Sequence, residues 1–272
     1  MKCLTVAISA VLMGSLAIFV RSIDVNPLIV TFFRMAFGLM YLLPAIKLVR
    51  FSLFKNLKVL SLSFVSLFTI VFYISSIQLV EMAVSALLLY MAPVYVILFM
   101  ILRGENVGKS SVFSLITALF GLYLLLSPYY SLNLGILFGI FAGLCYAGYF
   151  LLAKDVREFA SSIEITFITL LISSVALAPI ALSFDILSVL KAKLLWLLGL
   201  GLIPTAIPFI LLNYGIKFCK KESAPIIALI EPVSAGIFGF LFFNEILTLK
   251  QLIGAILILS SVLVALKSGV EG

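Results

Sequence analysis

The sequence contains no histidine and few charged residues, and each shortage excludes a class of site. Charged residues make up 11% of the 272 positions, whereas a soluble domain has about 25%. Without histidine the chain lacks the commonest metal ligand and the usual proton carrier near neutral pH, so proton chemistry would fall to carboxylates. No phosphate-binding loop, nucleophile motif or metal-ligand spacing occurs. We therefore expect no cofactor, no metal site and no ATP-driven chemistry within this chain.

Cysteine is also scarce. Cys3, Cys145 and Cys219 are odd in number, far apart, and placed in or beside apolar stretches. Such spacing suggests neither a disulfide framework nor a metal site. We expect all three to be packing residues.

Apolar residues are abundant instead, at 64% of the chain, and the mean hydropathy is +1.34. This composition is typical of an integral membrane protein, since a helix needs about 20 apolar residues to cross the bilayer. Lipid cannot hydrogen-bond the backbone, so the expected fold class is an all-α membrane protein with ten transmembrane helices. The stretch 4–20 lacks a cleavage site followed by polar sequence, and we interpret it as a retained first span.

The apolar windows between charged and turn-forming clusters define the expected spans. They are 3–20, 28–46, 59–77, 83–102, 111–127, 134–153, 163–183, 194–214, 224–243 and 250–266.

The basic residues predict an orientation. If the N-terminus is cytoplasmic, the inside loops hold thirteen of the eighteen basic residues, whereas the outside loops hold four and Arg34 lies within a span. Positive residues favour the cytoplasmic side, so we expect a multi-pass protein of the cell membrane with both termini cytoplasmic. Because the net charge of +7 is spread over short loops, it indicates membrane topology and no nucleic-acid partner.

The two halves of the chain resemble one another. Pro93 and Pro232 fall at the same offset as Ser76 and Gly215 (232 − 93 = 139 and 215 − 76 = 139). With five helices in each half, the second copy must enter the membrane from the opposite side. Such inverted repeats are typical of transporters that bind their substrate near the membrane midplane.

Several short motifs carry a resemblance to a known family. They are Met13-Gly-Ser, Phe33-Arg34, Ala92-Pro-Val with Arg103-Gly-Glu105, Ala224, Glu231-Pro-Val, Asn244-Glu245, and Gln251-Leu-Ile-Gly-Ala255. Over nearly its whole length the chain resembles the EamA-type family of the drug/metabolite transporter superfamily. The resemblance implies two inverted five-helix repeats, 1–129 and 130–272, around a central cavity, with export of amino acids or other small metabolites. Met13, Arg21 and Ser261 depart from the residues usual in that family, and they leave the substrate open.

Two ionisable residues lie well inside predicted spans, where charge is costly and faces the bundle interior. Glu231 could bind a substrate amine or carry a proton, or could instead accept hydrogen bonds from backbone amides at a kink. Arg34 could bind a substrate carboxylate, reach towards the outer interface, or pair with Glu231. For straight helices the two backbones would differ by about 10 Å in depth, so direct pairing would need stretched side chains or tilted helices.

Prolines and aromatic residues supply the remaining candidates. Pro93 and Pro232 could loosen matching helices for gating or form static kinks, and Pro204 with Pro208 should break the eighth span. Polar groups that could line the cavity are Tyr73, Tyr90, Tyr146, Tyr149, Asn213 and Tyr214, although packing explains most aromatic residues in membrane helices.

The terminal glutamates of two spans have a simpler expected role. Glu105 and Glu245 follow the fourth and ninth spans, and we expect them to cap the next helix.

These features favour a secondary transporter of the cytoplasmic membrane that exports amino acids or similar small polar metabolites by alternating access. Its partners would be a small-molecule substrate, with or without a coupling ion, and the lipid bilayer, and the protein would be a monomer or homodimer. A flippase or carrier of a lipid-linked or sugar-type substrate stays open. A membrane-embedded enzyme is less favoured, because it would require histidine or several carboxylates at one interface. We expect no enzymatic activity.

Overall fold

The computed structural model describes residues 2–127 and 133–269, which are helical throughout their regular structure and contain no strand. The helices and short helical turns follow one another as α1 (Leu4–Gly14), α2 (Leu16–Ile23), α3 (Pro27–Leu42), η1 (Leu43–Leu48), η2 (Phe51–Lys55), α4 (Leu57–Ile77), α5 (Met82–Leu89), α6 (Ala92–Leu102), α7 (Lys109–Leu126), α8 (Leu134–Val156), α9 (Ser162–Ala181), α10 (Ile186–Gly201), η3 (Leu202–Ala206), α11 (Ile207–Ile216), α12 (Ser223–Ala228), α13 (Ile230–Phe243) and α14 (Leu249–Ser268).

Within these residues ten helical stretches are long and apolar enough to cross a membrane, which confirms the expected fold class. Five of them are composed of two or three labelled helices, because the helix type changes or the helix breaks within the span. The eighth span begins at Ile186, earlier than the predicted start at 194. Lys193 lies inside it, at a kink with non-helical backbone angles, and its Nζ donates to the carbonyl of Ser22 at 2.9 Å. This charge is therefore accommodated within the helix and does not mark its beginning.

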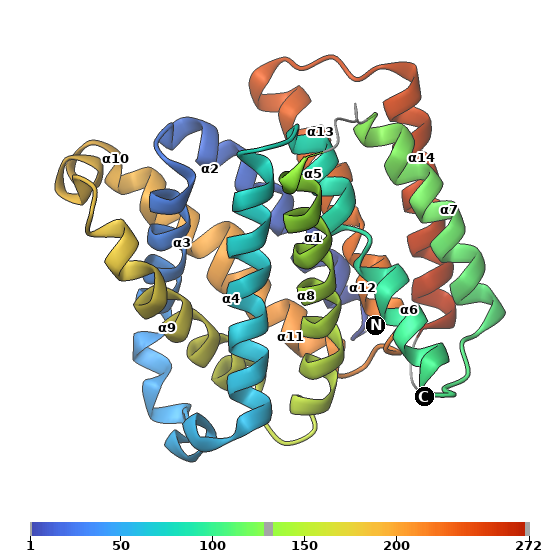
Figure 1. Cartoon of the computed structure of the whole chain (residues 1–272), viewed down its shortest axis with the longest axis horizontal. Coiled ribbons are helices and arrows are strands. Elements are labelled where there is room, and N and C mark those ends of the chain that lie inside the picture. Colours follow the sequence, from blue (N-terminus) through green and yellow to red (C-terminus); the bar gives the residue numbers. More distant parts are fainter. Residues whose placement is uncertain (1, 128–132, 270–272) are drawn as a thin grey trace.

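The helices form one bundle (Figure 1). Helices α7 and α14 pack against each other at the right of the figure, α3 packs on α9 and α10 at the left, and α4 packs on α8 in front. Helix α1 packs against α11 and α13 in the interior. Large apolar side chains such as Phe113, Ile116, Phe120, Ile256 and Leu263 are exposed on α7 and α14, as expected of surfaces that face lipid.

Polar residues fix where several spans begin. The Asn26 side chain accepts from the amide of Leu28, and Pro27 occupies the first position of α3. The side chain of Asn56 caps α4 in the same manner. Ser161 with Glu164 starts α9, and Thr248 with Gln251 starts α14; both pairs form reciprocal capping boxes. Each cap satisfies amides that have no partner within the helix.

The fourth and ninth spans break at matching places. Helix α5 ends at Leu89 and α12 ends at Ala228, each four residues before a proline, Pro93 or Pro232. A proline ring clashes with the carbonyl four residues earlier, which explains why both helices stop there. Each of these spans is therefore interrupted just before its proline, and α6 and α13 begin new helices inside the span. In the eighth span, η3 is a π-helical segment that contains Pro204, so the predicted break is present there too.

Small residues allow the first span to approach the ninth closely. A Cβ on Gly14 would overlap the Ser234 hydroxyl and would lie 2.9 Å from both the amide of Ala235 and the carbonyl of Glu231. The first span also breaks at Ser15, between α1 and α2. Gly14 therefore serves close packing between these two spans.

The expectation for two of the cysteines is wrong. Cys3 and Cys219 form a disulfide with Cα atoms 5.3 Å apart, and Cys145 is free. The bridge arises because α1 and α11 pack side by side, which brings together residues 216 positions apart. The amide of Lys220 also donates to the carbonyl of Gly269 at 2.8 Å. Both described chain ends therefore meet the α11–α12 loop at one side of the bundle, which we call the terminal face.

Candidate functional site

Glu231 lies in the first turn of α13, directly after the break at Leu229. It interacts electrostatically with Arg34 and with three tyrosines, Tyr73, Tyr90 and Tyr146. These side chains come from five different spans, counting Tyr90 at the break between α5 and α6. Five of the eight residues named from the sequence as binding or cavity-lining candidates therefore form one cluster, which we call the central cluster.

The central cluster lies inside the bundle, and most of its residues are only partly buried. Glu231, Arg34, Tyr73 and Tyr146 keep part of their surface accessible, whereas Tyr90 is buried. The carboxyl group of Glu231 lies at the N-terminus of α13, where the helix dipole favours its ionised form. Because polar groups from several helices converge there, the cluster has the character of a site for a small polar ligand.

Arg34 is held by the broken eighth span. Its Nε donates to Thr205 Oγ1 at 3.0 Å, and its Nη2 donates to the carbonyl of Pro204 at 3.1 Å. The guanidinium also lies 5.6 Å from the ring centre of Phe209. The π-helical segment η3 thus offers Arg34 a carbonyl that no regular helix would leave available. These neutral acceptors position the guanidinium without neutralising its charge.

Arg34 and Glu231 form no ion pair or hydrogen bond with each other among the described residues, although they interact at longer range. The structural pairing considered from the sequence is therefore not present. The Arg34 side chain is bound by η3 and does not reach towards the outer interface. No described backbone amide donates to the Glu231 carboxylate, so the hydrogen bonding considered for it at the kink is not observed. The central cluster consequently presents one basic and one acidic group at separate positions.

Asn213 lies beside the central cluster but has a different environment. It is 1% exposed, and its Oδ1 accepts from the Tyr149 hydroxyl at 3.0 Å. Its Nδ2 donates to Thr166 Oγ1 and to the carbonyl of Phe209. With its amide satisfied by protein groups, Asn213 connects α8, α9 and α11, and a ring contact of 6.5 Å between Tyr149 and Tyr146 links it to the cluster.

The two terminal glutamates do not cap the next helices, so that expectation is wrong. Helix α7 has Gly108 at its N-cap without a side-chain bond, and Thr248 caps α14. Glu105 instead forms an ion pair with Lys221 at 3.1 Å on the terminal face. Glu245 forms one with Arg21, whose guanidinium also lies over the ring of Phe243, on the opposite face. Each pair joins the first half of the chain to the second.

Sequence reasoning missed the role of Glu164. Arg50 Nε donates to Glu164 Oε1 at 2.6 Å and Nη2 donates to Oε2 at 3.0 Å, a bidentate pair that ties the loop after η1 to the start of α9. The carboxylate raises the pKa of the Arg50 guanidinium through this bonding. The spacing Ser161-x-x-Glu164 was the signal that could have located the helix start, but it says nothing about Arg50.

The ten spans, the broken helices and the internal charged cluster together define a polytopic membrane protein with a polar site inside its bundle. The model of the EamA-like transporter family matches residues 1–127 and again residues 133–267. The chain belongs to this family, and it is a membrane transporter.

Two transporters are similar to this chain in sequence, and one solved structure is similar to it in fold. An uncharacterized transporter of Archaeoglobus fulgidus is 45% identical over 260 residues, covering 96% of this chain and 94% of the relative. The uncharacterized transporter YwfM of Bacillus subtilis is 28% identical over 153 residues, 55% of this chain and 52% of its own length. A crystal structure of a protein with 18% identity superimposes with a TM-score of 0.79, covering 97% of this chain and 96% of that one, and this likeness concerns the fold alone.

Proposed function

We propose that the protein is a secondary transporter of the cell membrane that exports amino acids or closely similar zwitterionic metabolites by alternating access. The observation that carries this proposal is the separation of Arg34 and Glu231 inside one polar cluster, where Arg34 is held by Thr205 and Pro204 and forms no ion pair with Glu231. An α-amino acid carries a carboxylate and an ammonium on neighbouring atoms, so it can satisfy both groups at once.

In this proposal each residue has a defined role. Arg34 binds the substrate carboxylate with the donors that Pro204 and Thr205 leave available, because a guanidinium suits planar acids. Glu231 binds the ammonium, or a proton when the site is empty. Tyr73, Tyr90 and Tyr146 contact the rest of the substrate with their rings and hydroxyls.

The broken helices support the same site. Helices α6 and α13 start within the membrane after the breaks at Tyr90 and Leu229 (229 − 90 = 139). Discontinuous helices at corresponding places in two halves commonly mark substrate sites in transporters with inverted repeats. We propose that Pro93 and Pro232 maintain these breaks and that the halves 1–129 and 130–272 are the two repeats.

Two ion pairs suit the role of gates. Glu105–Lys221 joins the two halves on the terminal face, and Arg21–Glu245 joins them on the opposite face. Alternating access requires the halves to separate on one face at a time, so each opening would break one of these pairs. The basic loops favour the terminal face as cytoplasmic, which makes Glu105–Lys221 the inner gate and Arg21–Glu245 the outer gate.

A flippase or carrier of lipid-linked or sugar-type substrates is the second candidate. A neutral sugar would offer a counter-charge to neither Arg34 nor Glu231, which is the reason to prefer a zwitterion. A membrane-embedded enzyme has less support, because the central cluster offers a single carboxylate and the sequence has no histidine.

Efflux from proteoliposomes loaded with a panel of labelled amino acids tests the function. We expect the wild-type protein to release at least one labelled amino acid from the proteoliposomes. Glu231→Gln should lose this efflux. Glu158→Gln is the matched control, since Glu158 is an exposed carboxylate in the turn between α8 and α9 and is not part of the central cluster. Equal efflux in Glu231→Gln and wild type, with the same pH dependence, would refute the assigned role of Glu231. Transport of sugars alone would favour the second candidate.

A further inference from the structure

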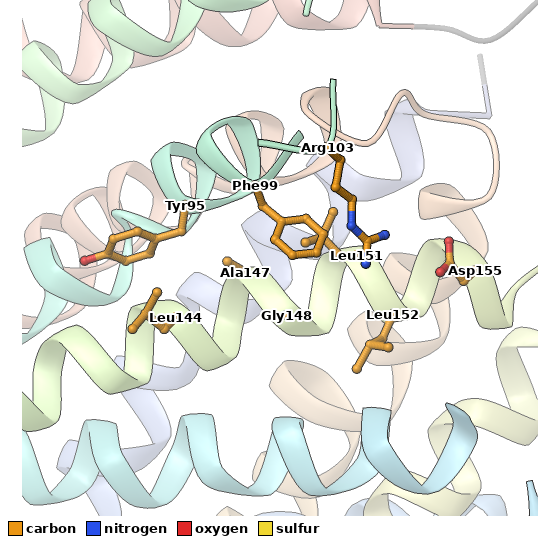
Figure 2. A pocket seen from close by; sticks show the side chains of 9 residues that line it. All are labelled: Tyr95, Phe99, Arg103, Leu144, Ala147, Gly148, Leu151, Leu152 and Asp155. Carbon is orange, nitrogen blue, oxygen red and sulfur yellow. The ribbon is translucent and has the colours of Figure 1, made fainter. Parts of the chain in front are cut away.

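A groove of about 310 Å³ lies between α6 and α8, outside the central cluster (Figure 2). Its walls are apolar for most of their length, with Tyr95 and Phe99 from α6 facing Leu144, Ala147 and Leu151 from α8. Phe99 and Leu144 are 38% and 44% exposed, although both lie within membrane-crossing helices. The groove therefore opens onto the surface that meets lipid.

Two opposite charges lie at one end of the groove. Arg103 follows the last turn of α6, and Asp155 is near the end of α8, so both belong to the terminal face. The Arg103 guanidinium lies 4.2 Å from the ring centre of Phe99, which places it over the apolar wall. Among the described residues neither Arg103 nor Asp155 has an ion-pair partner within 4.0 Å. In Figure 2 the two side chains are separated along α8 and leave the groove between α6 and α8 open.

A second groove occupies the corresponding place in the other half. It is lined by residues of α1, α13 and α14, among them Val11, Ser234 and Phe238. Ser234 and Phe238 lie 139 residues after Tyr95 and Phe99, the same offset that relates the two prolines (234 − 95 = 139 and 238 − 99 = 139). No charged residue lines this second groove. Repetition explains the apolar recess in both halves, but it does not explain the charges at the end of only one.

We propose that the α6–α8 groove is a binding site for a zwitterionic aminophospholipid of the membrane leaflet on the terminal face. One acyl chain lies along Tyr95, Phe99 and Leu144, the phosphate contacts Arg103, and the headgroup ammonium contacts Asp155. Arginine binds phosphate well, and burial of methylene groups against apolar walls stabilises the chain. The opposite signs of the two end charges match a phosphoethanolamine headgroup, whereas an anionic lipid would be repelled by Asp155.

The site is distinct from the substrate cluster, although the two share a helix. None of the cluster residues lines the groove. Ala147 of the groove directly follows Tyr146 of the cluster on α8, so a bound lipid would support the helix that presents Tyr146. This places the lipid in a position to affect transport without being transported.

Native mass spectrometry of the purified full chain tests the proposal, after exchange into nanodiscs with equal amounts of phosphatidylethanolamine and phosphatidylglycerol. We expect wild type to retain phosphatidylethanolamine preferentially. Arg103→Gln should lower its retention about fivefold, as expected for one basic contact worth about 1 kcal/mol. Asp155→Asn should retain lipid but lose the preference for phosphatidylethanolamine. Lys55→Gln, which removes an exposed basic residue of the η2 turn, should behave as wild type.

Cross-linking gives an independent readout. A phosphatidylethanolamine analogue with a photoreactive group in its acyl chain should label peptides of α6 and α8, and Arg103→Gln should reduce this labelling. Equal retention and labelling in wild type, Arg103→Gln and Asp155→Asn would overturn the proposal. So would displacement of the labelled lipid by transported amino acids, because that would make the groove part of the substrate path. Size-exclusion profiles and melting temperatures of each variant verify that it is folded.

Discussion

Glu105 and Lys221 form an ion pair across the terminal face, so a residue at the end of α6 binds a residue just before α12. Both side chains are about one-third exposed, at 31% and 32%. A partly exposed pair contributes about 0.2–1 kcal/mol, which is enough to shift the ratio of two conformations by a factor of about 1.4 to 5.

If this pair closes the terminal face, Glu105→Gln and Lys221→Gln should each increase the population that is open there, and the double variant should add little. Spin labels at Lys55 and Lys267, both on the terminal face, would report the populations as distance distributions. Lys220→Gln is the matched control, since Lys220 neighbours Lys221 and forms no ion pair among the described residues. Unchanged distributions in both single variants would show that the pair is not a gate.

The opposite face should respond in the opposite sense. Arg21→Gln removes the partner of Glu245 and should favour the state that is open away from the chain ends. Labels at Ser183 and Leu247 would measure that opening. A shift towards the terminal-face-open state would contradict the assignment of the two pairs to alternate gates.

The disulfide should contribute to stability. Cys3→Ser and Cys219→Ser each remove a bridge between α1 and the α11–α12 loop, and we expect a loss of about 2–4 kcal/mol in the free energy of unfolding. Thermal unfolding followed by fluorescence, with and without reductant, checks this. Cys145→Ser should unfold as wild type because Cys145 is free. Equal melting temperatures in all four proteins would show that the bridge does not stabilise the fold.

Close packing of the first span on the ninth should matter for transport. Gly14→Ala places a methyl group against the Ser234 hydroxyl and the backbone of Glu231 and Ala235, so α13 must move together with its carboxylate. We expect efflux to fall at least about tenfold in a protein that still folds. Gly236→Ala is the control on α13 itself, because a Cβ on Gly236 would meet only Leu247, at 3.7 Å. Efflux by this variant should stay near that of wild type. Equal efflux from both variants would show that the position of α13 is not critical.

Labelling tests the orientation. In a Cys145→Ser background, Ser183→Cys should react with an impermeant maleimide added outside cells, whereas Lys55→Cys should react only after lysis. The two positions are exposed and lie in loops on opposite sides of the bundle. The reverse pattern would place the termini outside.

Much of the fold follows from local sequence signals. Lipid leaves only helices as spans, so apolar windows located all ten of them, and proline chemistry located the breaks before Pro93 and Pro232. Lys193 misled the prediction, because the position of a charge in the sequence does not show whether a nearby carbonyl will bind it.

Contacts between distant segments could not be predicted in the same manner. Cys3 and Cys219 meet only because two helices pack side by side. Glu105 and Glu245 carry the acidic character of helix caps, yet their partners lie across the bundle. The depth estimate for Arg34 and Glu231 assumed straight helices, but η3 supplies the groups that hold Arg34 and Glu231 follows the break at Leu229.

Counterflow with three related substrates tests the central claim most directly. The substrates are the best transported amino acid, its decarboxylated amine and its deaminated acid, each measured with wild type, Arg34→Gln and Glu231→Gln. The account predicts that wild type needs both charges, so each analogue should require at least about tenfold more for half-maximal counterflow. Arg34→Gln should no longer distinguish the amino acid from the amine, and Glu231→Gln should no longer distinguish it from the acid. Undiminished discrimination in both variants would contradict the account, because Arg34 and Glu231 would then not be the groups that read the two ends of the substrate.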